Sequence, residues 1–156
     1  MPSAVASEES DVFSKSAEYA LRAVCVIARH ERASLTSEEV AEETHVPLEY
    51  LRKVLQSLRR SGIVETQRGS GGGVSLSRPT DQITAWDVVN AVDPIQRIPT
   101  CPLGLAEHEV QLCPMHAQLD HAMELAEHAL ESMTIADLLD PKSRKRRQCH
   151  FPIAGI

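Results

Sequence analysis

Residues 47–77 read PLEYLRKVLQSLRRSGIVETQRGSGGGVSLS, and this stretch decides the fold. Its first half carries leucine and valine at three- and four-residue spacing, the pattern of a helix that buries one face. Pro47 suits the first helical position, and Gly62 suits the left-handed position that ends a helix. The second half, residues 63–77, predicts a two-stranded hairpin whose turn is Gly69–Gly73.

The same stretch is basic, although the protein is acidic. It holds five basic residues against two acidic ones, which leaves +3, whereas the whole chain has a formal net charge of −6. The polar residues of the predicted helix lie mostly opposite its apolar face; they are Glu49, Arg52, Lys53, Gln56, Arg59 and Arg60. A basic, exposed helix face indicates an anionic partner.

Length and composition narrow the class of protein. At 156 residues the chain is one domain, alone or with an oligomerisation arm. Only 3% of the residues are aromatic, so alanine and leucine must fill the core, which favours helices. No apolar run is long enough to cross a membrane and the N-terminus is too polar for a signal peptide, so we expect a cytoplasmic protein. Its four cysteines are then more typical of thiols or metal ligands than of disulfides.

Two further helices are predicted before the basic stretch. The first runs from about Ser14 to Arg29 and carries Cys25 on its apolar side, as a small buried residue. The second begins at a capping box formed by Thr36 and Glu39. These helices, the tight turn that follows them and the helix with the basic face make a helix-turn-helix. The hairpin extends this motif to a winged helix. We therefore predict a mainly α fold with a small β-hairpin wing.

The glycine-rich tip of the hairpin is a second candidate contact with an anion. Arg68 stands at the base of this tip, and an arginine there can insert into a minor groove, which concentrates negative potential. Glycine-rich tips are by themselves more often plain turns, but this one follows a helix-turn-helix at the proper distance. A nucleotide-binding phosphate loop is a poor alternative, because no Gly-Lys-Ser/Thr follows the glycines.

The C-terminal half is acidic and contains a long predicted helix. Thr84 and Asp87 form a second capping box at the start of a helix over 85–92, and residues 94–113 show no periodicity. Pro114 then begins a helix to about Met133, and a last helical turn over 135–139 follows. A narrow apolar stripe along the long helix is typical of a helix that pairs with its own copy. The stripe consists of Leu119, Met123, Ala126 and Leu130.

These motifs together resemble the IscR/NsrR/CymR family of bacterial winged-helix regulators. The resemblance is carried by SKSAEYALRAV, EEVAEETHVPLEYLRKVLQSLRRSGIV, RGSGGGVSLSRP, ITAWDVVNAVD and CP…CPMH, over roughly residues 13–140. It implies a transcriptional repressor that binds a two-fold symmetric operator in double-stranded DNA as a homodimer. It also implies that the recognition helix enters the major groove and the wing the minor groove. The residues expected at DNA are Glu49, Tyr50, Arg52, Lys53, Gln56, Arg59, Arg68, Gly69 and Ser70.

The cysteine loop departs from the family pattern. Cluster-binding members place three cysteines there, whereas this chain keeps Cys101 and Cys113, and two thiolates do not hold an iron–sulfur cluster. The candidates to complete the ligand set are His116, Glu107, His108 and, from the first helix of the other subunit, Glu18. The hypothesis is a response to redox state, nitric oxide or an iron–sulfur cluster through the two cysteines. A zinc site, or a cluster-free regulator controlled by a partner protein or by thiol oxidation, stays open as an alternative.

The resulting division of the chain has five parts. Residues 1–12 form a disordered N-terminus, 13–93 the winged-helix domain, 94–113 the sensor loop, 114–140 the dimerisation helix and 141–156 a basic, flexible tail. An enzyme is the competing class, but no serine or cysteine has a recognisable base and orienting acid around it. We therefore predict that the protein is not an enzyme. His121 and His128 are predicted at the surface or an interface, and Cys149 receives no role.

Overall fold

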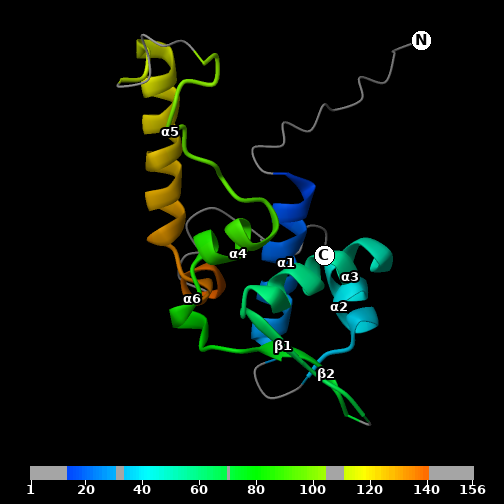
Figure 1. The fold of residues 1–156 in the computed structure, drawn as a ribbon. Helices are drawn as coiled ribbons and strands as arrows, with labels where there is room; N and C mark the ends of the chain where they lie inside the picture. Colours follow the sequence, from blue (N-terminus) through cyan, green and yellow to red (C-terminus); the bar gives the residue numbers. More distant parts are fainter. Residues whose placement is uncertain (1–13, 31–33, 70, 105–110, 141–156) are drawn as a thin grey trace, which may run out of the picture.

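The computed structural model of the protein describes residues 14–30, 34–69, 71–104 and 111–140, and it has the predicted mainly helical architecture with a hairpin wing (Figure 1). The predicted N-terminal segment, the basic tail, Ser70, Glu107, His108 and Cys149 lie outside the described residues. The elements are α1 (Lys15–Arg29), α2 (Ser37–Thr44), α3 (Leu48–Arg60), β1 (Val64–Gln67), β2 (Gly73–Leu76), the short 3₁₀ helix η1 (Thr80–Gln82), α4 (Ala85–Val92), α5 (Pro114–Glu131) and α6 (Ile135–Leu139).

Helix α1 forms the centre of the core. It packs against α2, α3, α4, α6 and β2, and most of its residues are buried. Alanines at positions 17, 20, 23 and 28 are at most 2% exposed, and their small side chains let the neighbouring helices approach closely. Cys25 is fully buried among them, as its place in the apolar stripe predicted.

The helix-turn-helix follows from local signals in the chain. The predicted capping box forms at the start of α2, where the Glu39 backbone N–H donates to Thr36 Oγ1 and the Thr36 backbone N–H donates to Glu39 Oε2. His45 then adopts a left-handed conformation with φ 55°, which turns the chain into α3. Pro47 precedes α3 as its N-cap rather than opening it, because its ψ of 128° is extended. Gly62 follows the last turn with φ 69°, as predicted.

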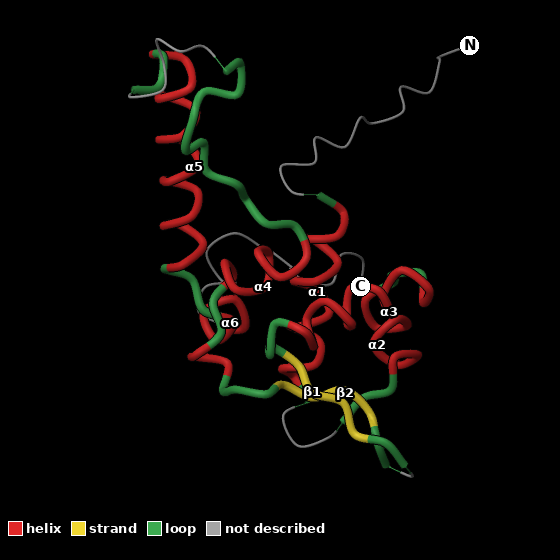
Figure 2. Tube along the Cα trace, in the orientation of Figure 1, coloured by secondary structure: helices red, strands yellow, loops and turns green. Residues whose placement is uncertain are grey.

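The wing is a two-stranded antiparallel hairpin (Figure 2). Its register pairs Val64 with Leu76 and Gln67 with Gly73. The predicted turn Gly69–Gly73 therefore ends one residue too late, because Gly73 belongs to β2. Gly73 pairs with Gln67, and the neighbouring Val74 bonds in both directions to Leu35, just before α2, at 3.0 and 2.6 Å. A Cβ on Gly73 would lie 2.5 Å from the Leu35 carbonyl oxygen, so glycine is required at this crossing.

Helix α5 projects from the winged helix, and its C-terminal end lies beside α6, where the chain rejoins the core (Figure 1). It ends at Glu131, two residues before the predicted Met133. The chain then returns to the core: Ala85 N–H donates to the Met133 carbonyl and Ile135 N–H donates to the Ile83 carbonyl. Ile135 is fully buried at the start of α6, where a capping box forms between Thr134 and Asp137. Within the described residues, no helix is long and apolar enough to span a membrane.

Candidate functional site

The exposed face of α3 is the first candidate site. Leucines and a valine on one side of the helix are buried in the core, and this anchors the polar side toward solvent. The residues exposed there are Glu49, Arg52, Lys53, Gln56, Arg59 and Arg60. Of the residues expected at DNA on this helix, Tyr50 stands apart: its hydroxyl shares a 2.6 Å hydrogen bond with Ser16 of α1. Its ring also packs edge-on against Tyr19, so Tyr50 marks the border between α3 and α1.

The cations of this face differ in how they are paired. Arg52 Nη1 lies 2.7 Å from Glu49 Oε1, and Arg52 Nη2 lies 2.9 Å from Glu38 Oε1 on α2. Lys53, Arg59 and Arg60 form no ion pair within the described ranges. Their charges therefore point to solvent uncompensated, as a surface that binds phosphates requires.

The wing that carries Arg68 is hydrogen-bonded at its base to the end of α3. Ile63 N–H donates to the Leu58 carbonyl and Ser77 N–H donates to the Ile63 carbonyl, so the base of the hairpin is hydrogen-bonded to the end of α3. Arg68 follows the last residue of β1 and is exposed. Gly69 next to it has φ 109°, which lets the backbone turn sharply at the tip. The strand that leads to Arg68 is thus joined at its base to the helix that carries the other cations.

The cysteine site is a second candidate, and the structure brings part of it together. Cys113 is the N-cap residue of α5, and its Sγ lies 3.3 Å from Nδ1 of His116, one turn into the helix. Within α5, whose residues are all described, His116 is the buried one, at 8% exposure. Cys101 is equally buried. Glu18 is ion-paired with Arg22 on α1.

This ligand set does not fit an iron–sulfur cluster by itself. Among the described residues, no three His, Cys, Asp or Glu side chains are grouped closely enough to hold a metal ion. Cys113 and His116 make a pair, whereas a cluster takes four ligands. The predicted ligands Glu107 and His108 lie outside the described residues.

The connection from α4 to the cysteines is clamped onto α5 by an arginine that the sequence did not reveal. Arg97 binds both carboxylate oxygens of Asp120, through Nε at 2.8 Å and Nη2 at 2.7 Å, and the Ile98 N–H donates to the same carboxylate at 2.8 Å. The Arg97 hydrogen bond, followed by that of Ile98, lowers the pKa of Asp120 from its ordinary 3.8 to about 2. The clamp ties the segment that carries Cys101 to the helix that Cys113 begins. Arg97 and Asp120 are 23 residues apart, and Arg97 lies in a segment without periodicity. No local sequence pattern therefore indicates this contact.

Helix α5 presents the predicted dimerisation stripe, with one change. Leu119 and Ala126 are exposed and Met123 is half-buried, but Leu130 packs against the core of its own chain. Met115 and Leu125, which the stripe did not include, are 60% and 57% exposed. His121 and His128 lie at the surface beside Glu124 and Glu131.

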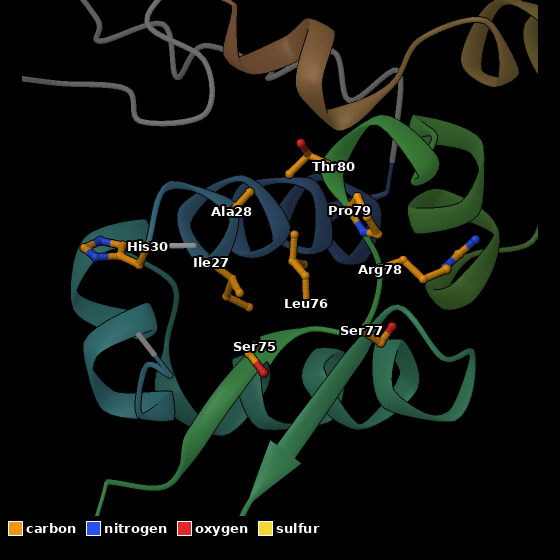
Figure 3. A pocket seen from close by; sticks show the side chains of 9 residues that line it. All are labelled: Ile27, Ala28, His30, Ser75, Leu76, Ser77, Arg78, Pro79 and Thr80. Atoms are coloured by element: carbon orange, nitrogen blue, oxygen red, sulfur yellow. The ribbon is translucent and has the colours of Figure 1, made fainter. Parts of the chain in front are cut away.

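A cavity of about 430 Å³ lies between the end of α1 and strand β2, away from these sites (Figure 3). Ile27, Ala28 and Leu76 are among the residues that line it. Three of its polar side chains have partners: Ser77 donates to the Gly62 carbonyl, Arg78 donates to the Gln82 carbonyl, and His30 lies 3.0 Å from Glu43. No function is assigned to this cavity.

Comparison with known proteins agrees with this arrangement. Residues 13–141 match the model of the Rrf2 family, described as "Iron-dependent Transcriptional regulator". Protein aau3 of Rhizobium meliloti (strain 1021) is 33% identical over 140 residues, which cover 88% of each chain. Two solved structures share the fold. IscR of T. potens has a TM-score of 0.69 at 20% identity, over 87% of this chain and 90% of its own. CymR, the global cysteine regulator of B. subtilis, has a TM-score of 0.65 at 23% identity, over 81% and 94%.

The winged helix-turn-helix, the uncompensated cations on its exposed helix and the family match over most of the chain agree with one another. The chain therefore belongs to the Rrf2 family, and it is a DNA-binding transcriptional regulator rather than an enzyme.

Proposed function

We propose that the protein is a sequence-specific transcriptional regulator that binds a two-fold symmetric operator as a homodimer, in the cytoplasm. In this proposal residues 13–93 bind DNA, 94–113 sense a signal and 114–140 pair the two subunits. The observation that carries it is the exposed α3 face, where Lys53, Arg59 and Arg60 have no protein partner among the described residues. Helix α3 would lie in the major groove, and Arg68 would reach the adjacent minor groove.

The other residues of the DNA surface have distinct places in this proposal. Glu49, Arg52 and Gln56 point outward from α3 toward base edges, while Gly69 and Ser70 let the tip of the wing approach a phosphate. Tyr50 connects the start of α3 to α1 through its hydrogen bond with Ser16. From the border of the α3 face it would contact the phosphate backbone of the DNA.

Pairing through α5 is supported by its exposed apolar residues. A helix that leaves Met115, Leu119 and Leu125 in solvent buries them in a stable protein by packing against a partner. Pairing by a two-fold axis would repeat the α3 face on the second subunit and match a two-fold operator.

The signal enters, in our proposal, at Cys101 and Cys113. Cys113 begins α5, and the Arg97–Asp120 clamp connects the Cys101 segment to the same helix. Chemistry that links or modifies these thiols therefore acts on the helix that sets the distance between the two α3 faces. A ligand or oxidant changes operator affinity only if it favours one dimer geometry over another. An iron–sulfur cluster would need a ligand besides Cys101, Cys113 and His116, such as Glu18 of the partner subunit, whereas thiol oxidation or a protein partner would not.

Salt dependence tests the DNA proposal. An operator is selected from random duplex DNA, and the association constant is measured as the salt concentration rises. Lys53→Ala and Arg59→Ala should each lower the salt slope by about one unit, because each removes one phosphate contact. Arg29→Ala, an exposed cation on α1, serves as the control and should leave the slope unchanged. Binding that does not respond to salt would contradict the proposal.

The sensor proposal is tested separately, with the protein purified without oxygen. A visible absorption band that Cys101→Ala abolishes would identify a cluster, and a colourless protein with full operator affinity would identify thiol or partner control. Cys101→Ser and Cys113→Ser should shift operator affinity in the same direction, with and without oxidant or nitric oxide. If both variants bind and respond like the wild type, the signal enters elsewhere.

A further inference from the structure

We propose that Glu38, on α2 and outside the set of residues expected at DNA, is a positioning residue that sets sequence specificity by holding Arg52. This inference rests on the proposed DNA-binding function and adds to it a residue and a mechanism of base selection. Arg52 would read a guanine from a fixed position, and the carboxylates beside it would keep it from swinging to the phosphate backbone.

The geometry around Arg52 differs from that of the other cations on α3. Its guanidinium lies between Glu38, contributed by α2, and Glu49, one turn earlier on α3. Each carboxylate accepts from a different terminal nitrogen, so the plane of the guanidinium is held from two sides. Within the described residues, Arg52 is the cation of the α3 face that is paired, and its side chain stays 51% exposed.

Both carboxylates are held by well-ordered elements. Glu38 lies in the first turn of α2, where the capping box of Thr36 and Glu39 fixes the start of the helix. The turn between α2 and α3 is closed by the hydrogen bond from the Val46 N–H to the Ala41 carbonyl, at 3.2 Å. The two helices also pack directly on each other. The backbone positions that carry Glu38 and Arg52 are therefore set by the packing of the helix-turn-helix.

The guanidinium keeps enough donors to bind DNA while both glutamates hold it. An arginine has five N–H donors, and the two glutamates take one from each terminal nitrogen. The remaining donors match the two acceptors, O6 and N7, that guanine presents in the major groove. A contact to a phosphate oxygen needs no such fixed fork, because any donor that reaches the backbone can make it.

Holding Arg52 therefore affects specific and non-specific binding in opposite directions. At a guanine in the correct position, the guanidinium is already oriented and loses little freedom on binding. On any other sequence it stays between its carboxylates, contributes no phosphate contact and leaves a net negative group near the backbone. An exposed ion pair is worth about 0.2–1 kcal/mol, which corresponds to at most about a fivefold change in affinity.

The test compares Glu38→Gln with Glu42→Gln. Glu42 lies one turn further along α2 and makes no side-chain hydrogen bond or ion pair among the described residues, so its variant changes the same charge without touching Arg52. Affinity is measured for a duplex selected from random DNA by the wild type and for a random-sequence duplex of equal length. Thermal unfolding of both variants checks that α2 remains folded.

Glu38→Gln should lower the ratio of the two affinities more than Glu42→Gln does, by up to about fivefold. It should also steepen the salt dependence on random DNA by about one unit, because the freed Arg52 gains a phosphate contact. A selection repeated with Glu38→Gln should lose its guanine preference at one position of each half-site. In an Arg52→Ala background, Glu38→Gln and Glu42→Gln should have equal effects.

Two results would overturn the inference: equal effects of the two glutamine variants in the wild-type background, or a Glu38 effect that persists without Arg52. A wild-type protein that prefers no duplex over random DNA would overturn the proposed function itself. The two failures are therefore distinguishable, since the first requires a wild type that binds its selected duplex specifically.

Discussion

At the scale of single residues, the arginines are distinguished by what already binds them. Arg97 is bound through two of its nitrogens by Asp120, and Arg52 is held by Glu38 and Glu49. Arg68 is exposed on the wing and has no ion pair within the described ranges. An arginine with its donors free binds a phosphate or a groove, whereas one bound by a carboxylate has a structural role or a restricted direction.

Arg68→Ala should weaken binding to the selected operator by about 1–3 kcal/mol and weaken binding to random DNA less. The reason is that an arginine in a narrow, A·T-rich minor groove reads the shape of the groove as well as its charge. Titration of both duplexes at one salt concentration measures the difference. An equal loss on the two duplexes would make Arg68 a simple phosphate contact.

Asp120→Asn should lower the thermal midpoint near neutral pH, because it breaks the clamp on Arg97. The pKa of Asp120 is lowered from 3.8 to about 2 in the folded protein, so the unfolded chain binds its proton more tightly. The stabilisation is therefore complete above the ordinary value and is lost as the pH falls through about 2.

Thermal unfolding of the wild type and of Asp120→Asn at several pH values checks this expectation. The two midpoints should differ most above about pH 5 and should converge toward about pH 2. Glu127→Gln is the matched control, since Glu127 lies 3.7 Å from Arg97 without a hydrogen bond. A pH-independent difference would mean that the Asp120 carboxylate does not act through its charge.

At the scale of elements, the wing is fixed by its crossing with the segment before α2. Leu35 forms an isolated antiparallel bridge with Val74 of β2, so a third short segment lies beside the hairpin. The hairpin is also bonded to the end of α3 through Ile63. The orientation of the wing relative to the recognition helix therefore depends on backbone contacts on both of its sides.

Gly73→Ala should destabilise the protein by about 1–3 kcal/mol, because the new methyl group would press on the backbone of Leu35. Urea unfolding measures the loss. Ser75→Ala, two residues later in the same strand, is the control and should change stability much less. If Gly73→Ala unfolds at the wild-type urea concentration, the crossing of Leu35 and β2 is not tight.

At the scale of the whole molecule, α5 has more apolar surface than one chain covers. One side of the helix is occupied by Arg97 and the connection to α4, and its end is anchored by α6. The side that carries Met115, Leu119 and Ala126 faces solvent in the single chain. This division supports our proposal that α5 is the pairing helix.

Leu119→Glu should convert the dimer to a monomer, because pairing would bury an unpaired carboxylate at a cost of several kcal/mol. Leu119 is 47% exposed in the single chain, so the monomer should remain folded. Sedimentation gives the mass, and circular dichroism checks the helix content. Gln118→Glu adds the same charge beside it as a control. A dimer that persists in Leu119→Glu would place the interface elsewhere.

Local patterns determined the elements of this protein and most of their ends. The three capping boxes and the buried stripe of α3 join residues three or four positions apart, so each can be recognised without knowing the rest of the fold. The errors at Pro47, Gly73 and the end of α5 are of one or two residues. At Pro47 the backbone remains extended, and at Gly73 the pairing with Gln67 lengthens the strand by one residue.

Only the tertiary structure decided which charged and polar groups meet. Arg52 and Glu38 are 14 residues apart, Arg97 and Asp120 are 23 apart, and Ser16 and Tyr50 are 34 apart. No helical or strand periodicity relates such pairs, because their distance is set by how α1, α2, α3 and α5 pack. The sequence by itself therefore determined a winged helix with a basic face, because the apolar residues that each helix buries recur every three or four positions. The folded arrangement decided which of its cations are free, since ion pairs form wherever packing brings opposite charges together.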